Sequence, residues 1–240
     1  MSVPKLLVML VSAGMMLSGY AGKACAEDAG VIKGKVIFKG DPEKFKRAPL
    51  DTTKDANCIK KIGSEDVIVD AGTPPTLRNV LVSIKEGLGD KKFPAPATPA
   101  VLNQEGCQYT PHVLGVVEGQ QVEIKNSDPT AHNIHFLPKI NEELNKSQPK
   151  QNMVDKTTLK TEAAFKVKCD VHPWMGMWIA VFPHPFFAVS DKTGAYEIKG
   201  LPPGKYTVEA WHEKLGTSVQ TIEVDPSKAP AALDFTFEPK

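Results

Sequence analysis

The chain has few of the residues and runs that many protein classes require. Its 240 residues include four cysteines and six histidines, and no Cys-x-x-Cys pair occurs, which argues against a zinc ribbon or a c-type haem attachment. The 29 basic and 28 acidic residues give no positive excess for non-specific nucleic-acid binding. After the N-terminus no apolar run is long enough to span a membrane, and no internal repeat is present.

The N-terminus carries the pattern of a secretory signal peptide over residues 1–26. Lys5 precedes an apolar run from Leu6 to Leu17, and Ala24-Cys25-Ala26 supplies a small-x-small cleavage site. A lipoprotein anchor at Cys25 fits less well, because Lys23 would lie inside the apolar lipobox. Cleavage after Ala26 removes two of the 29 basic residues, so 27 basic residues would face 28 acidic ones. We therefore expect export to the periplasm or an equivalent compartment, with no membrane span in the mature chain.

The cysteine count predicts one disulfide. Export removes Cys25 and leaves Cys58, Cys107 and Cys169. An odd thiol in an oxidising compartment is either reactive or a metal ligand. Cys169 has the neighbours of a ligand, so Cys58 and Cys107 are expected to pair.

Strand patterns dominate the chain and predict an all-β fold of packed sandwiches. Ile32, Val36 and Phe38 alternate with lysines, which is the period-two pattern of a half-buried strand. Turn residues such as Pro, Gly, Asn and Asp separate the strands. Similar runs occupy Asn79–Lys85, Val113–Val117, Gln121–Lys125, Ala164–Cys169, Trp178–Phe182, Tyr206–Trp211 and Val219–Val224. Two stretches look irregular: residues 93–98 could join two domains, and the polar residues 137–161 could hold a short helix around Ile140–Lys146.

Two segments carry the residues of a metal site. The first is a turn, residues 126–131, followed by a strand that opens with His132; the second is the loop from Cys169 through His172 to Met177. Copper that alternates between Cu(I) and Cu(II) favours a soft thiolate, imidazoles and a weak axial thioether. The loop supplies a cysteine, a histidine and a methionine, and His132 is the best-placed second imidazole.

Strand parity places the Cys169 thiol toward the interior. Phe165, Val167 and Cys169 share one face of a strand, whereas Lys166 and Lys168 share the other. A dry site suits electron transfer, because few waters then reorganise when the charge of the metal changes.

These residues resemble the blue-copper cupredoxins. Cys169-Asp-Val-His172-Pro-Trp-Met175 is similar to the ligand loop of amicyanins, and Asp128 through His132-Asn133-Ile134 is similar to the turn and strand that bear the family's first histidine ligand. The resemblance covers roughly residues 100–182. It implies a Greek-key sandwich with one type 1 copper ion near one end and His172 at the surface as the electron port. It also implies that Asn133 ties the two ligand loops together.

The axial ligand stays open between two methionines. Met175 follows the cysteine by six residues, as in amicyanin-like loops, and Met177 follows it by eight, as in plastocyanin- or pseudoazurin-like loops. His-Pro-aromatic-Met favours Met175, in which case Met177 packs in the core.

The flanks resemble a second family, the carboxypeptidase regulatory-like, transthyretin-type sandwiches. The similarity rests on residues 34–40, 79–84 and 191–198 and above all on Gly200-Leu-Pro-Pro-Gly-Lys-Tyr-Thr-Val208. Matching strands lie before and after the metal-binding segment. We therefore expect a cupredoxin domain over residues 93–182 inserted into a smaller sandwich formed by residues 27–92 and 183–240.

The remaining candidate residues have plainer interpretations. Trp174 is either core or, with Pro173, an apolar collar where a redox partner docks. His135 lies on the strand face opposite His132 and is expected to be structural or solvent-facing. The other histidines, His112, His184 and His212, are expected to form structural hydrogen bonds.

The sequence favours an electron carrier that exchanges one electron with a partner such as a cytochrome or a dehydrogenase. An enzyme is not expected: nitrite reductases and multicopper oxidases need further histidine-rich centres, and no His-x-His pair occurs. A binuclear centre would need a second cysteine in the loop, where Pro173 stands. The alternative is a metal-free or copper-storing sandwich that acts as a binding subunit. Zinc could also occupy a Cys-His-His site, but the methionine would then have no role.

Overall fold

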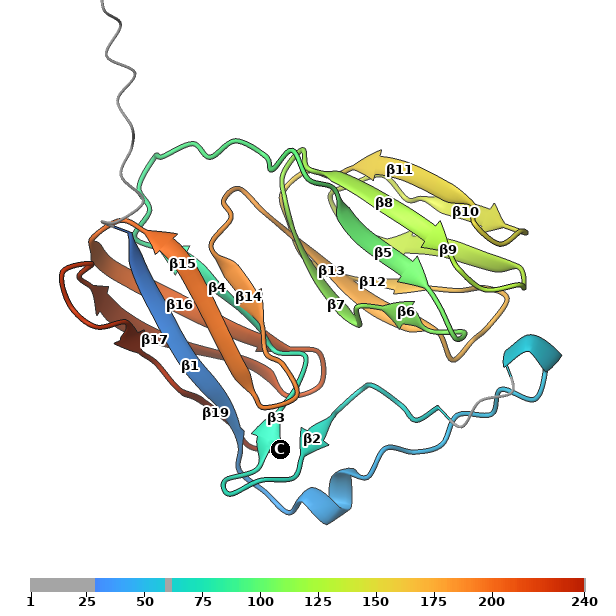
Figure 1. Cartoon of the computed structure of the whole chain (residues 1–240), viewed down its shortest axis with the longest axis horizontal. Helices are drawn as coiled ribbons and strands as arrows, with labels where there is room; N and C mark the ends of the chain where they lie inside the picture. The colour runs from blue at the N-terminus through green and yellow to red at the C-terminus, as the bar shows by residue number, and fades with distance from the viewer. Residues whose placement is uncertain (1–28, 59–61, 240) are drawn as a thin grey trace, which may run out of the picture.

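The computed structural model describes residues 29–58 and 62–239, and these residues form two β-sandwiches placed side by side (Figure 1). The central sandwich is built from residues 100–182, and the flanking sandwich from strands that precede and follow it. The all-β fold class expected from the sequence is confirmed. The predicted signal peptide lies outside the described residues. No helix in the described part of the chain is long and apolar enough to cross a membrane.

The central sandwich packs a five-stranded sheet on a four-stranded sheet. The first has the order β10-β9-β12-β13-β7 and the second β11-β8-β5-β6. Two pairings, β13 with β7 and β5 with β8, are parallel, and the others are antiparallel. The strands are β5 (Ala100–Gln104), β6 (Tyr109–Thr110), β7 (Val113–Val117), β8 (Gln121–Asn126), β9 (His132–Leu137), β10 (Asn145–Gln148), β11 (Val154–Thr158), β12 (Glu162–Lys168) and β13 (Gly176–Phe182).

The flanking sandwich is discontinuous in sequence. One sheet has the order β15-β1-β3-β2, with β18 and β19 also paired to β1, and the other has the order β14-β4-β16-β17. The chain therefore leaves this sandwich after β4 and returns to it at β14. The strands are β1 (Gly30–Phe38), β2 (Val69–Asp70), β3 (Thr76–Leu77), β4 (Leu81–Glu86), β14 (Phe187–Val189), β15 (Ala195–Leu201), β16 (Gly204–His212), β17 (Gly216–Val224), β18 (Ala231–Ala232) and β19 (Phe235–Phe237).

Each sandwich has its own apolar core, and a small third cluster joins them. The alternating residues of β1 point into the flanking core, where Ile32 and Val36 are fully buried. Burial of one such side chain contributes about 1.5–3 kcal/mol. Between the sandwiches, Leu81 packs with Val113, and the Trp178 and Trp211 rings meet edge to face with centroids 5.4 Å apart. This apolar junction fixes how the central sandwich sits on its neighbour.

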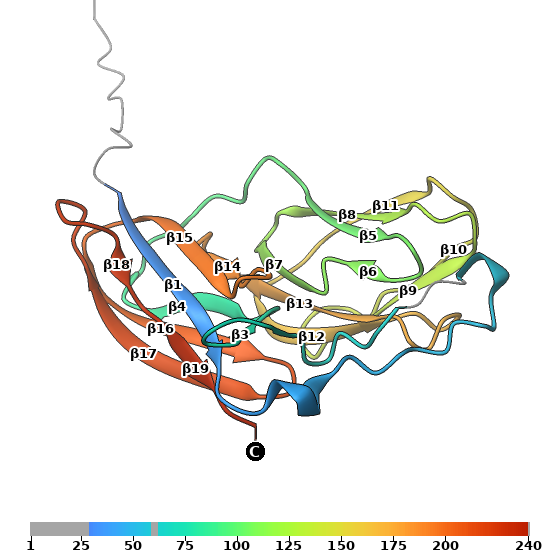
Figure 2. The same ribbon diagram turned by 60° about the horizontal axis from the view of Figure 1, so that its bottom comes forward.

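A segment over residues 41–58, called the strap below, crosses from the flanking sandwich to the central one (Figures 1 and 2). It follows β1 and contains two 3-10 turns, η2 (Pro42–Phe45) and η3 (Ala56–Cys58). Cys58 at its end is disulfide-bonded to Cys107 and belongs to the central core. The sequence assigned the whole of residues 27–92 to the flanking sandwich, whereas the end of the strap packs against the central one.

The disulfide that cysteine counting predicts is therefore present. Cys58 and Cys107 are separated by 49 residues in sequence, and both are buried. Cys169 is the free cysteine of the described residues and is buried as well. The bond closes a long loop and pins the strap to the bend between β5 and β6.

The expected short helix around Ile140–Lys146 is wrong. The chain forms bends there and then strand β10, which pairs with β9. The Glu162 carboxylate accepts the backbone amides of Lys139, Ile140 (3.0 Å) and Asn141 (2.9 Å). These bonds hold the backbone in a loop, and Ile140 is left exposed instead of anchoring a helix face.

Removing the disulfide should destabilise the metal-free protein by about 4 kcal/mol, because a bond between residues 49 apart restricts a long loop of the unfolded chain. The change is the double variant Cys58→Ser/Cys107→Ser, and urea unfolding measures the free energy. Cys169→Ala, which keeps the disulfide, is the matched control and should lose less. A double variant as stable as this control would contradict the prediction.

His212 should make the flanking sandwich sensitive to acid. Burial lowers the pKa of His212 from 6.5 to about 4, while its Nδ1 accepts the amides of Lys214 (3.1 Å) and Leu215 (3.3 Å). The unfolded chain thus takes up the proton first as the pH falls. Stability from this group is complete above pH 6.5 and should fall by roughly 1.4 kcal/mol per unit as the pH decreases from 6.5 toward 4.

The variant His212→Asn keeps an acceptor near the Nδ1 position and removes the titration. Urea unfolding at several pH values between 7 and 4 should give a shallower loss of stability for this variant than for the wild type. Equal slopes would contradict the assignment to His212.

Candidate metal centre

The first ligand segment is the turn over residues 126–131, which is followed by His132 at the start of β9. Asn126 holds the turn closed: its Oδ1 accepts the Asp128 amide (2.9 Å), and its Nδ2 donates to the Thr130 carbonyl (2.9 Å). His132 is fully buried at the start of β9. The turn therefore delivers an imidazole to the interior at the end of the sandwich.

The second ligand segment, residues 169–175, is a compact loop between β12 and β13. The amide of Cys169 donates to the Met175 carbonyl (3.2 Å), and the amide of Met175 donates to the His172 carbonyl (2.9 Å). Cys169 is 2% exposed, so the inward direction predicted from strand parity is correct. The loop is held in shape by its own backbone.

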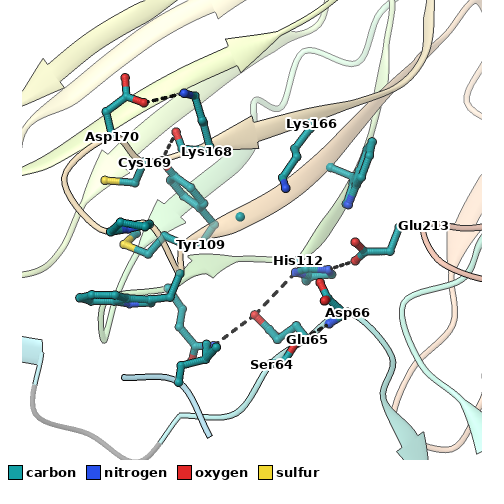
Figure 3. A pocket seen from close by; sticks show the side chains of 17 residues that line it. Ser64, Glu65, Asp66, Tyr109, His112, Lys166, Lys168, Cys169, Asp170 and Glu213 are labelled. Carbon is teal, nitrogen blue, oxygen red and sulfur yellow. Dashed lines mark hydrogen bonds and ion pairs between the residues drawn. The ribbon is translucent and has the colours of Figure 1, made fainter. Parts of the chain in front are cut away.

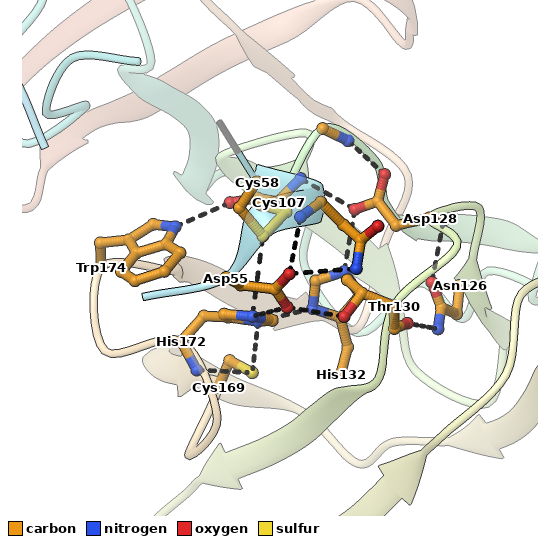
Figure 4. Close-up of a disulfide and its surroundings, with 12 residues drawn as sticks. Asp55, Cys58, Cys107, Asn126, Asp128, Thr130, His132, Cys169, His172 and Trp174 are labelled. Atoms are coloured by element: carbon orange, nitrogen blue, oxygen red, sulfur yellow. Dashed lines mark hydrogen bonds and ion pairs between the residues drawn. A yellow bond between two sulfur atoms is a disulfide. The ribbon is translucent and has the colours of Figure 1, made fainter. Parts of the chain in front are cut away.

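Three donor atoms from these two segments converge at one buried point (Figure 4). The Nδ1 atoms of His132 and His172 lie 3.0 Å apart, and the Cys169 sulfur lies 3.9 Å from Nδ1 of His172. All three side chains are buried and offer atoms within 4.8 Å of one another. A thiolate and two imidazoles in a dry pocket are a donor set that suits copper, and the residues present fit that ion.

The Cys169 sulfur also accepts two weak backbone hydrogen bonds. The amides of Asn133 and His172 each point at Sγ from 3.4 Å. Such bonds orient the sulfur and would stabilise it as a ligand of a bound metal ion.

The two candidate axial methionines sit in different surroundings. Met175 closes the ligand loop through its backbone bonds to Cys169 and His172. Met177 lies within β13, directly opposite Val167 on β12, and is fully buried in the central core. Residue 175 thus belongs to the loop that carries the other donors, whereas residue 177 belongs to a regular strand.

Each candidate ligand histidine has a carboxylate on its remote nitrogen. Nε2 of His132 lies 2.8 Å from Asp128, and Nε2 of His172 lies 3.1 Å from Asp55. Carboxylate acceptors keep the proton on Nε2 and leave Nδ1 free to face the thiol. Burial lowers the pKa of His132, against the opposing effect of Asp128. Sequence reasoning missed Asp55, because it lies 117 positions before His172 and no pattern links the two.

His172 is not at the surface, which corrects what the family resemblance implies. Its exposed fraction is 2%, and the end of the strap covers its Nε2 edge. The Cys58 sulfur lies 3.7 Å from this nitrogen. The strap thus occupies the position at which a solvent-facing electron port was expected.

Asn133 and Tyr109 connect the two ligand segments. Oδ1 of Asn133 accepts the Asp170 amide (3.1 Å), and the hydroxyl of Tyr109 donates to the carbonyls of Asn133 (2.5 Å) and Lys168 (2.9 Å). Burial raises the pKa of Tyr109, so the hydroxyl stays protonated. The sequence singled out Asn133 but not Tyr109, whose contacts depend on the packing of β6 against both segments.

A cavity of about 450 Å³ opens beside the ligand loop (Figure 3). Pro173, Trp174 and Met175 line it at one end, and Glu213 lines it at the end near the flanking sandwich. Pro173 is exposed, and half-buried Trp174 donates from Nε1 to the Cys107 carbonyl (3.1 Å). The loop therefore borders an open cavity on its Pro173 and Trp174 side, and Leu50 of the strap lines the same cavity.

The other four histidines lie apart from the convergence point and have local partners. His112 contacts Glu65 and Glu213, and His135 contacts Asp170 and Glu143. His184 donates to the Ile84 carbonyl (2.9 Å), and His212 accepts backbone amides. Among the described residues, each group of metal-binding donors includes His132 or His172.

The comparisons with known proteins agree on the central sandwich. Residues 98–182 match the copper binding proteins of the plastocyanin/azurin family. No curated protein sequence matches the chain. The match leaves out the flanking sandwich, so its resemblance to the regulatory-like sandwiches stays a prediction.

Several solved copper proteins are similar to part of the chain. A purple cupredoxin from Nitrosopumilus maritimus is 20% identical over 35% of this chain and 99% of its own, with a TM-score of 0.30. An oxidized amicyanin mutant is 20% identical over 42% of this chain and 98% of its own, with a TM-score of 0.33. The copper-containing nitrite reductase of Thermus scotoductus SA-01 is 19% identical over 38% of this chain and 25% of its own, with a TM-score of 0.31. The family match, by contrast, covers residues 98–182, and the strap and the flanking sandwich lie outside it.

Proposed function

We propose that this chain is an exported type 1 copper protein that carries single electrons between redox partners. The observation that carries the proposal is the convergence of the Cys169 sulfur and the Nδ1 atoms of His132 and His172 at one buried point. The match of residues 98–182 to a copper-binding family supports it. The N-terminal pattern supports export to the periplasm or an equivalent compartment.

In this function His132, Cys169 and His172 would hold one copper ion, with Met175 as the axial ligand and Met177 as the alternative. The ion, when bound, supplies a site that gains and loses one electron. The protein contributes rigidity and exclusion of water: the ligand loop is closed by backbone bonds, and all three donors are buried. A site that cannot rearrange and holds little water has a low reorganisation cost on electron transfer.

The partner is proposed to be a redox protein such as a cytochrome or a dehydrogenase. It would dock at the exposed side of the ligand loop, where Pro173 and Val171 are exposed and Trp174 is half-buried. An exposed apolar group of this kind rimmed by Lys168 and Asp170 fits a transient protein interface.

A second function is a copper-storing or metal-free binding subunit. The observation that favours it is the strap, which covers the His172 edge that an electron carrier would be expected to expose. In that case the flanking sandwich would make the main contacts and copper would be dispensable for them.

Stoichiometric Cu(II) should give the mature protein an intense thiolate-to-copper absorption band and the electron paramagnetic resonance spectrum of a type 1 site. The band should be absent in Cys169→Ser, because serine offers no thiolate. His184→Gln changes a buried histidine away from the site and should keep the band. Copper binding without the band in the wild type would sink the electron-carrier proposal and favour the storing or metal-free subunit.

The absorption band and the reduction potential should respond to the substitution of only one of the two methionines. Met175→Leu should shift the band and raise the reduction potential, because removal of a thioether sulfur withdraws a donor that favours Cu(II). Met177→Leu is the volume-matched control and should change the free energy of unfolding by less than about 1.5 kcal/mol without moving the spectrum. The reverse pattern would assign Met177 instead.

A further inference from the structure

The strap brings a carboxylate from outside the family-matched segment onto a ligand histidine. Asp55 lies in the strap, and its Oδ2 is 3.1 Å from Nε2 of His172. The family match begins at residue 98, so nothing in the copper-binding pattern supplies this group. His172 is thereby buried with its remote nitrogen paired instead of facing water.

Asp55 is held in place from several directions (Figure 4). Its Oδ1 accepts the amide of Asn57 (2.8 Å), and its Oδ2 accepts the hydroxyl of Thr130 (2.6 Å). The Cys58–Cys107 disulfide fixes the chain three residues later. Together these contacts fix the direction in which Oδ2 faces Nε2 of His172.

Each of the two imidazoles has a carboxylate within hydrogen-bond distance of its Nε2. Asp128 pairs with His132 and also accepts the amides of Gly106 (2.7 Å) and Cys107 (2.8 Å). Cys107 thus links both arrangements: its amide orients Asp128, and its disulfide positions the strap that carries Asp55. Both Nδ1 atoms are left with their lone pairs free, within 4.8 Å of the Cys169 sulfur.

We propose that Asp55 is a positioning residue that holds His172 as a ligand and lowers the reduction potential of the copper site. The inference rests on the proposed function and adds a group that the copper-binding family match does not contain. A carboxylate on Nε2 makes the imidazole a stronger donor, and its charge stabilises Cu(II) more than Cu(I), because Cu(II) carries one more positive charge.

The test is Asp55→Asn in the full mature chain loaded with copper. Asparagine preserves the shape and an acceptor oxygen but removes the charge. Loss of a carboxylate behind a ligand histidine reduces metal affinity by about 10- to 100-fold. If Cu(II) loses tenfold more affinity than Cu(I), the reduction potential rises by about 59 mV.

Asp51→Asn is the matched control. Asp51 lies in the same strap, is exposed, and has its hydrogen bonds within its own turn, to Thr53. The substitution removes the same charge from the strap without touching His172. The potential, measured by spectroelectrochemical titration, should rise in Asp55→Asn and stay near the wild-type value in Asp51→Asn.

A second variant keeps Asp55 and should move the potential the opposite way. Thr130→Val has nearly the same shape but removes the hydroxyl that donates to Oδ2. Without this competing donor, the hydrogen bond between Oδ2 and Nε2 of His172 should strengthen. The imidazole then becomes a stronger ligand for Cu(II), and the reduction potential should fall. This variant keeps the proposal testable even if Asp55→Asn does not fold.

The outcomes separate this inference from the proposed function. A wild type without the thiolate-to-copper band would end the proposed function itself. If the band is present, equal potentials in the wild type and Asp55→Asn, or an equal rise in Asp51→Asn, would overturn the role of Asp55 and leave the copper site intact. A rise of the potential in Thr130→Val would also overturn it. If Asp55 were merely structural, Asp55→Asn would lower the free energy of unfolding, but Asp55→Asn and Thr130→Val would not shift the potential in opposite directions.

Discussion

The need to satisfy every nitrogen of two buried imidazoles governs the arrangement around the centre. An unpaired polar group in a dry interior costs free energy, so a buried ligand histidine needs an acceptor on the nitrogen that does not face the metal. Asp128 meets this need for His132 from the adjacent turn. Asp55 meets it for His172 from a distant part of the chain, which requires the strap, and the disulfide then holds the strap in place.

The strap makes the two sandwiches interdependent. It starts at the end of β1 in the flanking sandwich and ends in the core of the central one. The apolar junction around Leu81 and Val113 sets the distance that the strap must cross. The flanking sandwich therefore acts as a base for a segment that covers the Nε2 edge of His172 in the candidate metal centre.

The polar atoms around Cys169 hold its sulfur in place without water. Two backbone amides point at it, and the Tyr109 hydroxyl joins the strands that present it. Because the loop from Cys169 to Met175 closes on itself through backbone bonds, few side-chain changes elsewhere would alter its shape. The strap, by contrast, is held by one disulfide, by backbone bonds of residues 48–50 to residues 62–64 and by a few side-chain contacts.

The sequence by itself determined the all-β class, most strand positions, the pairing of Cys58 with Cys107 and the short loop that holds Cys169, His172 and Met175. Period-two burial and ligand spacing are visible in neighbouring residues, and the cysteine pairing follows from the count of cysteines. Only the tertiary structure decided that residues 140–146 form a loop, since Glu162 lies 16 or more positions away, and that His172 is covered. Asp55 and His172 are 117 positions apart in sequence. Their contact therefore depends on how the two sandwiches pack and on where the disulfide holds the strap.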